Sequence, residues 1–177
     1  MDPYKDSLTR KLKFKCREIQ SELNEAELIY NNAASEFCEH VCSFCSDGGH
    51  KNPLDDIFKQ NSSAKNKTKL AAQFKKVFSS IVVQTHPDKT KDVSRVETYQ
   101  KAVEAKKENK VENLVSIAQD LKINISHLSY SDLRELESKI DKMEKKIDSI
   151  HKSYPWIWYY SPADKRQNII KDFCIPA

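Results

Sequence analysis

Apolar residues recur at alternating intervals of four and three along the first part of the chain, and charged or polar residues fill most positions between them. This spacing is typical of a long helix that buries one narrow stripe, as the helices of coiled coils do. The pattern therefore predicts a heptad helix over residues 1–46. Its stripe consists of Leu12, Cys16, Ile19, Leu23, Ala26, Tyr30, Ala33 and Phe37.

A second stripe with the same alternation lies within residues 123–153. Polar residues 129–132 suit the start of this helix, and Pro155 follows its end. Because each narrow stripe needs an apolar partner, we expect the two helices to bury each other in a long antiparallel coiled-coil hairpin. Self-association of either stripe into a homo-oligomer is the competing arrangement. The second stripe consists of Leu133, Leu136, Ile140, Met143, Ile147 and Ile150.

The remaining residues predict a linker, a small helical module and a C-terminal segment. Residues 47–64 contain both glycines of the chain and a polar run, so they predict a linker loop. Residues 65–122 have apolar residues at helical spacing, with a break at Pro87 because the residue before a proline disfavours the helical conformation. Residues 154–177 predict an aromatic segment and a short helix that begins near Pro162.

Composition favours an all-α fold. Charged residues make up 32% of the chain, mean hydropathy is -0.72, and the scarcity of glycine disfavours a sheet with many tight turns. We therefore expect an all-α protein in which the module of residues 65–122 is inserted at the end of the coiled-coil hairpin.

Apolar content also bears on location. No apolar run approaches the roughly 20 residues that a membrane span needs, and no apolar signal core follows the charged N-terminus. We therefore expect no membrane association and an intracellular, cytoplasmic protein, in a host cell if the chain is viral. The five cysteines are then expected to be reduced thiols or metal ligands rather than disulfides.

Positive charge is concentrated in one stretch of the chain. Between Lys59 and Lys91 there are eight lysines and one acidic residue, Asp88. Such a stretch favours an acidic partner. Lysines outnumber arginines and no aromatic residue alternates with them, so a basic helical protein that binds nucleic acid is kept only as a second alternative.

The break in the module carries the motif His86-Pro87-Asp88-Lys89. Pro87 fixes one backbone dihedral and lacks an N–H, so the chain must leave the helix and project a short, stiff loop. An ionised Asp88 offers two acceptor oxygens that suit a bidentate arginine of a partner, and His86 can stiffen the loop or contact the partner itself. An ordinary helix-terminating turn is the other interpretation, since Pro and Asp both favour turns.

In its context this motif resembles the J domain of DnaJ-like co-chaperones, which stimulate seventy-kilodalton heat-shock chaperones. Residues 69–85 match the family's second helix, with Lys75 and Lys76 on its exposed side. The heptad helix and the aromatic segment are also similar to small J-domain proteins of bacteriophages and large DNA viruses; that segment reads Trp156-Ile157-Trp158-Tyr159. Tyr99, Val103, Glu104 and Ala105 fall where the family's third helix carries an aromatic anchor and a Glu-Ala pair.

The resemblance implies a function. The family's loop and basic helix face dock where the chaperone's nucleotide-binding and substrate domains meet, and they accelerate ATP hydrolysis by the chaperone. The chain itself is therefore not expected to be an enzyme. An adaptor that uses its coiled-coil arm as a scaffold is the alternative function. Carried over to this chain, the chaperone-binding residues are His86, Pro87, Asp88, Lys89, Lys75 and Lys76.

This chain departs from the family's pattern at one place. In many family members the basic face continues to the end of the second helix, whereas Ser79, Ser80 and Gln84 stand there in this chain. Weaker docking, or docking on a particular partner, is the expected consequence.

Three cysteines near the end of the first helix form a separate candidate site. Cys38, Cys42 and Cys45 lie at i, i+4 and i+7 on one helix face, and His50 follows shortly after. Three thiols and one imidazole could supply a tetrahedral zinc set, and zinc is the one cofactor that the sequence suggests. Plain packing of the cysteines in an apolar core is the main alternative, and redox chemistry is a third interpretation.

Overall fold

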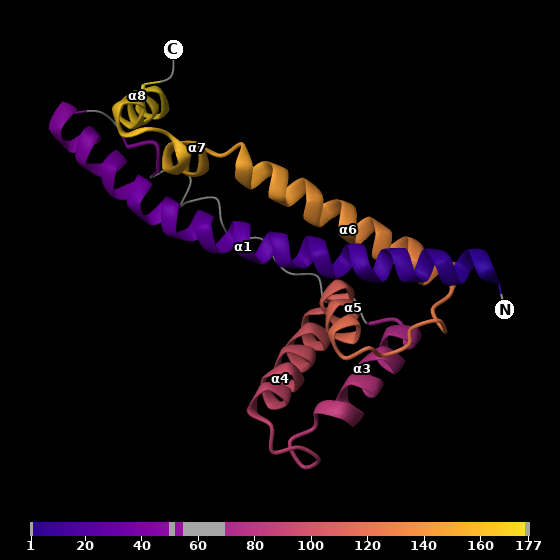
Figure 1. The fold of residues 1–177 in the computed structure, drawn as a ribbon. Coiled ribbons are helices and arrows are strands. Elements are labelled where there is room, and N and C mark those ends of the chain that lie inside the picture. The colour runs from indigo at the N-terminus through magenta and orange to yellow at the C-terminus, as the bar shows by residue number, and fades with distance from the viewer. Residues whose placement is uncertain (1, 50–51, 55–69, 176–177) are drawn as a thin grey trace. The chain divides into compact units, whose positions relative to one another are not determined.

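The computed structural model describes residues 2–49, 52–54 and 70–175 (Figure 1). All regular structure in these ranges is helical, which confirms the prediction of an all-α protein. No helix in these ranges is both long and apolar enough to cross a membrane. The helices are α1 (Pro3–Gly48), α3 (Ala72–Thr85), α4 (Val93–Glu108), α5 (Val111–Asp120), α6 (Tyr130–His151), α7 (Tyr154–Tyr160) and α8 (Ala163–Cys174).

The chain divides into two compact units. Unit 1 comprises Met1–Glu22 and Asn66–Glu144, and unit 2 comprises Leu23–Lys65 and Lys145–Ala177. The helix predicted for residues 1–46 extends to Gly48 as α1. Most of the linker predicted for residues 47–64 lies outside the described residues.

Helix α1 buries the stripe that its heptad spacing predicts. Ile19 and Tyr30 are half-buried, and the other six predicted members are buried. Charged residues occupy the opposite side of the helix, so its packing is confined to one face. The stripe continues beyond Phe37 through Val41 and Cys45, both buried in unit 2.

In unit 1, helices α3, α4 and α5 pack against one another. Helix α4 contributes Ala102 and Ala105 to this core, and these small side chains allow its backbone to approach its neighbours closely. Asn109 ends α4 in the left-handed conformation (φ 57°), where asparagine is tolerated, and its N–H bonds to the carbonyl of Ala105. The other core residues of the three helices are Phe74, Val77, Ile81, Thr85, Val111, Leu114, Val115 and Ala118.

The first turns of α1 hold this bundle through polar contacts within unit 1. The thiol of Cys16 donates to the carbonyl of Glu112 on α5 (3.2 Å), and the ammonium of Lys13 donates to the carbonyl of Ile123 (2.6 Å). Arg17 pairs with Asp120 at the end of α5. These contacts fix α5 and the residues after it on the N-terminal part of α1.

Contacts in unit 1 contradict the predicted antiparallel direction of the two long helices. The hydroxyl of Tyr130, at the start of α6, donates to Asp2 just before α1 (2.6 Å). Further along both helices, the ammonium of Lys15 lies 2.8 Å from the carboxylate of Glu144. Contacts that advance in the same direction along both sequences require parallel helices, so the antiparallel prediction is wrong. Antiparallel packing is simplest for a short connection, whereas here α3 to α5 lie in a connection long enough to return the chain to the start of α1.

The core of unit 2 brings the end of α1 together with α7 and α8. Trp158 of α7 is buried and meets Phe37 edge to face, with ring centroids 6.0 Å apart. The guanidinium of Arg166 lies over the Trp158 ring, 4.9 Å from its centroid, and donates to the carbonyl of Tyr159 (2.8 Å). The aromatic segment thus closes a helical core through Trp158, while Tyr160 stays exposed. The core consists of Phe37, Val41, Cys45, Leu54, Trp158, Ile170 and Cys174.

Candidate functional site: the His86–Asp88 loop

The loop begins where α3 ends. Thr85 is buried, and its hydroxyl donates to the carbonyl of Ile81 (2.8 Å) within the last turn. His86 has left the helical conformation (φ -59°, ψ 133°), although its N–H still bonds to the carbonyl of Val82. This extended backbone is the conformation that a residue before proline prefers, so Pro87 sets the point where the chain turns away.

His86 organises the turn through its backbone and its ring. Its carbonyl accepts the N–H groups of Lys89 (2.9 Å) and Thr90 (3.2 Å). Its Nδ1 accepts the N–H of Asp88 (3.2 Å), which requires the tautomer with the proton on Nε2. Asp88, Lys89 and Thr90 are therefore all hydrogen-bonded to this one histidine.

Helix α4 holds the other side of the loop. The ring of Tyr99 meets the ring of His86 edge to face, with centroids 5.2 Å apart. The guanidinium of Arg95 donates to the carbonyl of Gln84 (3.4 Å), so the start of α4 is linked to the end of α3. Asp92 caps α4 by accepting the N–H of Ser94 (3.0 Å). The loop is therefore fixed at both ends by elements of unit 1.

Asp88 is presented to solvent by this frame. Its side chain is 87% exposed, whereas that of His86 is 32% exposed. One carboxylate oxygen of Asp88 lies 3.5 Å from Nδ1 of His86, which is too long for a strong hydrogen bond. The carboxylate oxygens therefore remain available to accept hydrogen bonds from a partner. The arrangement offers a fixed, accessible anion at the tip of the loop.

The predicted basic residues lie on the exposed side of α3 and in the loop. Lys75 and Lys76 are exposed near the beginning of α3, and Lys89 is exposed beside Asp88. Between them, the hydroxyls of Ser79 and Ser80 bond back to the carbonyls one turn earlier (3.0 and 3.1 Å). This surface is therefore basic at one end, neutral in the middle and mixed in charge at the loop.

Sequence reasoning missed Val83. It lies outside the buried stripe of α3 and is 60% exposed, one turn before His86. Residues 76, 79, 80 and 83 share one helix face because they are three or four positions apart. The signal in the sequence was a β-branched apolar residue on the otherwise polar face of the helix.

The residues aligned with the third helix of the resembled family lie on α4. Tyr99 contacts His86, and Ala105 is buried against the bundle. Glu104 is exposed, and Val103 is partly exposed. The aromatic position is therefore the one that reaches the loop.

The structure describes three of the four predicted zinc residues. Cys38 is half-buried, Cys42 is exposed and Cys45 is buried, while His50 lies outside the described residues. Within the ranges that the structure describes, no three His, Cys, Asp or Glu side chains are grouped to hold a metal ion. The sulfur of Cys45 instead lies beside that of Cys174, a neighbour that the predicted set did not contain.

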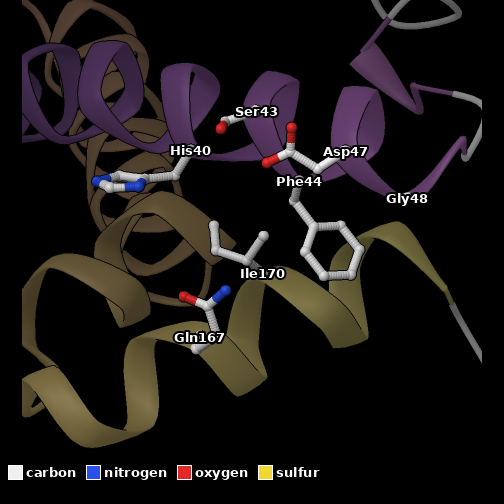
Figure 2. Close-up of a pocket in the computed structure, with 7 residues that line it drawn as sticks. All are labelled: His40, Ser43, Phe44, Asp47, Gly48, Gln167 and Ile170. Atoms are coloured by element: carbon white, nitrogen blue, oxygen red, sulfur yellow. The ribbon is translucent and has the colours of Figure 1, made fainter.

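Unit 2 also contains an open pocket of about 540 Å³ between α1 and α8 (Figure 2). Figure 2 shows the imidazole of His40 pointing away from the carboxylate of Asp47, with Ser43 between them on the helix. The pocket's polar side chains are therefore not arranged as a nucleophile with its base. Its lining is His40, Ser43, Phe44, Asp47, Gly48, Gln167 and Ile170.

Comparison of the chain with protein-family models, curated proteins and solved structures gives no match. Function is therefore inferred from the geometry of the site.

Proposed function

We propose that the chain is a J-domain co-chaperone that docks on a seventy-kilodalton heat-shock chaperone and stimulates its ATPase. The observation that carries the proposal is the exposed carboxylate of Asp88 on a loop that His86 and Tyr99 hold in place. An ordinary turn needs only a proline and a polar residue. A loop with its histidine fixed from two helices and its aspartate left open suits recognition by a partner.

The proposal includes a J-like module formed by α3, the loop, α4 and α5. Its support is the order of the elements, in which two helices that pack together flank the His-Pro-Asp loop. Further support is that Lys75 and Lys76 are exposed on α3 and that Tyr99 of α4 contacts His86. In this proposal, the paired seams of α1 and α6 form a coiled-coil arm that carries the module.

The mechanism assigns the chemistry to the partner. Asp88 accepts two N–H donors of a partner arginine, a charge-assisted contact worth about 1.5 to 3 kcal/mol. Lys75, Lys76 and Lys89 attract an acidic surface on the chaperone and orient the encounter. Val83 adds apolar contact beside the loop. Because docking favours the hydrolysis-competent state of the chaperone, its ATP is hydrolysed faster while this chain remains unchanged.

The test is a single-turnover ATPase assay with a chaperone from the same cell. Asp88→Asn keeps the volume of the side chain and its preference for turns but removes the charge, so stimulation is expected to fall about tenfold or more. Asp172→Asn makes the same change at an exposed position of α8 and serves as the matched control. Circular dichroism verifies that both variants are folded. Equal stimulation by the two variants would show that the loop is not the docking element.

A scaffold function is the second candidate. It is favoured by exposed apolar side chains on α1, among them Phe14 and Leu28. Such side chains suit contact with another helix. In the ATPase assay a scaffold predicts no dependence on Asp88 and binding that is lost when Phe14 and Leu28 are replaced by serine.

A further inference from the structure

Two cysteines from distant parts of the chain meet in the core of unit 2. Cys45 belongs to the last turns of α1, and Cys174 ends α8. Their sulfur atoms are 3.6 Å apart, and the thiol of Cys45 donates to the sulfur of Cys174. Both residues are buried, with 4% and 9% of their surfaces exposed. The pair is therefore a sulfur–sulfur contact inside one core rather than two separate surface thiols.

The surrounding side chains hold the two sulfur atoms in register. Cys45 and Cys174 belong to the same apolar cluster as Val41 and Ile170, and Phe173 packs its ring against Phe37 with centroids 5.2 Å apart. A disulfide requires the sulfur atoms to approach by about 1.5 Å more, and rotation about the Cα–Cβ bonds changes the distance between them.

We propose that Cys45 and Cys174 form a reversible disulfide that fastens α8 to the end of α1. The oxidant is a peroxide, which is small enough to reach a buried thiol. One thiolate attacks the O–O bond of hydrogen peroxide, forming a sulfenic acid and releasing hydroxide. The second thiolate then attacks that sulfur, forming the S–S bond and releasing a second hydroxide. The two thiol protons convert both hydroxides to water, and a dithiol reductant reverses the reaction.

The environment of the two cysteines determines how fast the disulfide forms. Burial in the apolar core raises the pKa of Cys174 to about 11. At neutral pH this residue is therefore almost entirely the thiol, while the thiolate is the reacting form. The disulfide is expected to form under sustained peroxide exposure rather than in a rapid burst.

The other described cysteines provide internal comparisons. Cys16 lies in unit 1, where its thiol donates to the carbonyl of Glu112. Cys38 and Cys42 lie on the same helix as Cys45, and the exposed Cys42 accepts from the side-chain amide of Asn52 (3.4 Å). A disulfide between Cys45 and Cys174 therefore joins α1 to α8, whereas one between Cys38 and Cys42 would remain within α1.

The experiment treats the full chain with hydrogen peroxide, blocks remaining thiols with N-ethylmaleimide, and maps the peptides without reduction. The expected product is a monomer that has lost two hydrogen atoms and contains a peptide pair joined through Cys45 and Cys174. Cys174→Ser is expected to abolish this product, and the matched variant Cys38→Ser to retain it. Disulfides found only within α1, only between two molecules, or with equal yield in a urea-unfolded sample would each overturn the proposal.

A second measurement tests the fastening itself. The bond closes a long loop of the chain, so the oxidised protein is expected to melt about 5 to 10 °C higher than the reduced protein. Addition of dithiothreitol should restore the original Tm. An oxidised protein that contains the joined peptides and melts at the same temperature would refute the fastening role. Neither measurement involves a chaperone, so their outcomes are independent of the ATPase assay.

Discussion

The loop after α3 and the core of unit 2 use reactive side chains in opposite ways. In the loop, a histidine is fixed by a backbone N–H and the ring of Tyr99, and the neighbouring aspartate is left in solvent. In unit 2, two thiols, an indole and a phenyl ring are buried in one cluster, and the partly buried ring of Phe173 packs against it. The loop buries little apolar surface, whereas the core of unit 2 is made almost entirely of buried apolar side chains.

The difference separates stability from recognition along the chain. A buried aromatic side chain stabilises the fold because its apolar surface is removed from water. Its truncation therefore lowers the free energy of unfolding. An exposed carboxylate contributes little to folding, so its loss appears only when a partner is present. Substitutions in the core of unit 2 should therefore change stability, whereas substitutions in the loop should change only the response of a partner.

The largest expected effect is on stability, from Phe37→Ala in unit 2. Phe37 is buried against Trp158 and Phe173, so the truncation leaves a cavity and should lower the unfolding free energy by about 3 to 5 kcal/mol. Urea denaturation followed by far-ultraviolet circular dichroism measures this change. Phe14→Ala on the same helix removes an exposed ring and should change stability by about 0.5 kcal/mol or less. Similar losses in both variants would contradict the assignment of the core.

A smaller effect is expected from Tyr99→Ala beside the loop. The edge-to-face contact with His86 is worth about 0.5 to 1.5 kcal/mol, so its removal should reduce chaperone stimulation about two- to tenfold while the chain remains folded. Tyr99→Phe keeps the ring and should preserve stimulation. If both variants behave as the parent chain does, the loop does not depend on α4 for its conformation.

The smallest effect is expected from Ser80→Lys, which adds a positive charge between Lys76 and the loop. An exposed charge contributes a few tenths of a kcal/mol to about 1 kcal/mol, so the concentration for half-maximal stimulation should fall about two- to fivefold. The gain should diminish at high ionic strength because surface charges are screened. Ser46→Lys adds the same charge at an exposed position of α1 and should not improve stimulation. An equal gain from both substitutions would indicate nonspecific attraction.

Periodicity predicted most of the helices, because burial on one face leaves a regular trace in the sequence. The stripe from Leu12 to Phe37 and the break at Pro87 both appear in the structure. The direction of α6 relative to α1 was not predictable in this way, since a heptad stripe is satisfied equally by a parallel or an antiparallel partner. The connection between α1 and α6, which contains α3, α4 and α5, decided that choice.

The candidate site was predictable only where a residue type restricts its own backbone. Pro87 forces the exit from α3, so the loop could be located from sequence. The contact between His86 and Tyr99 depends on how α3 and α4 pack, and that packing is not encoded by spacing alone. Likewise, Cys174 lies 129 positions from Cys45, and only the folding of unit 2 brings them together.

The parallel direction of α1 and α6 within unit 1 affects the order in which the chain can fold. On the ribosome, the first turns of α1 are made early, but the segment of α6 that pairs with them ends only at Glu144. At synthesis rates of roughly 5 to 20 residues per second, the apolar stripe of α1 waits on the order of ten seconds for this partner. During that interval α3, α4 and α5 emerge first, so Cys16 and its neighbours on α1 can be covered by α5 before α6 has been synthesised.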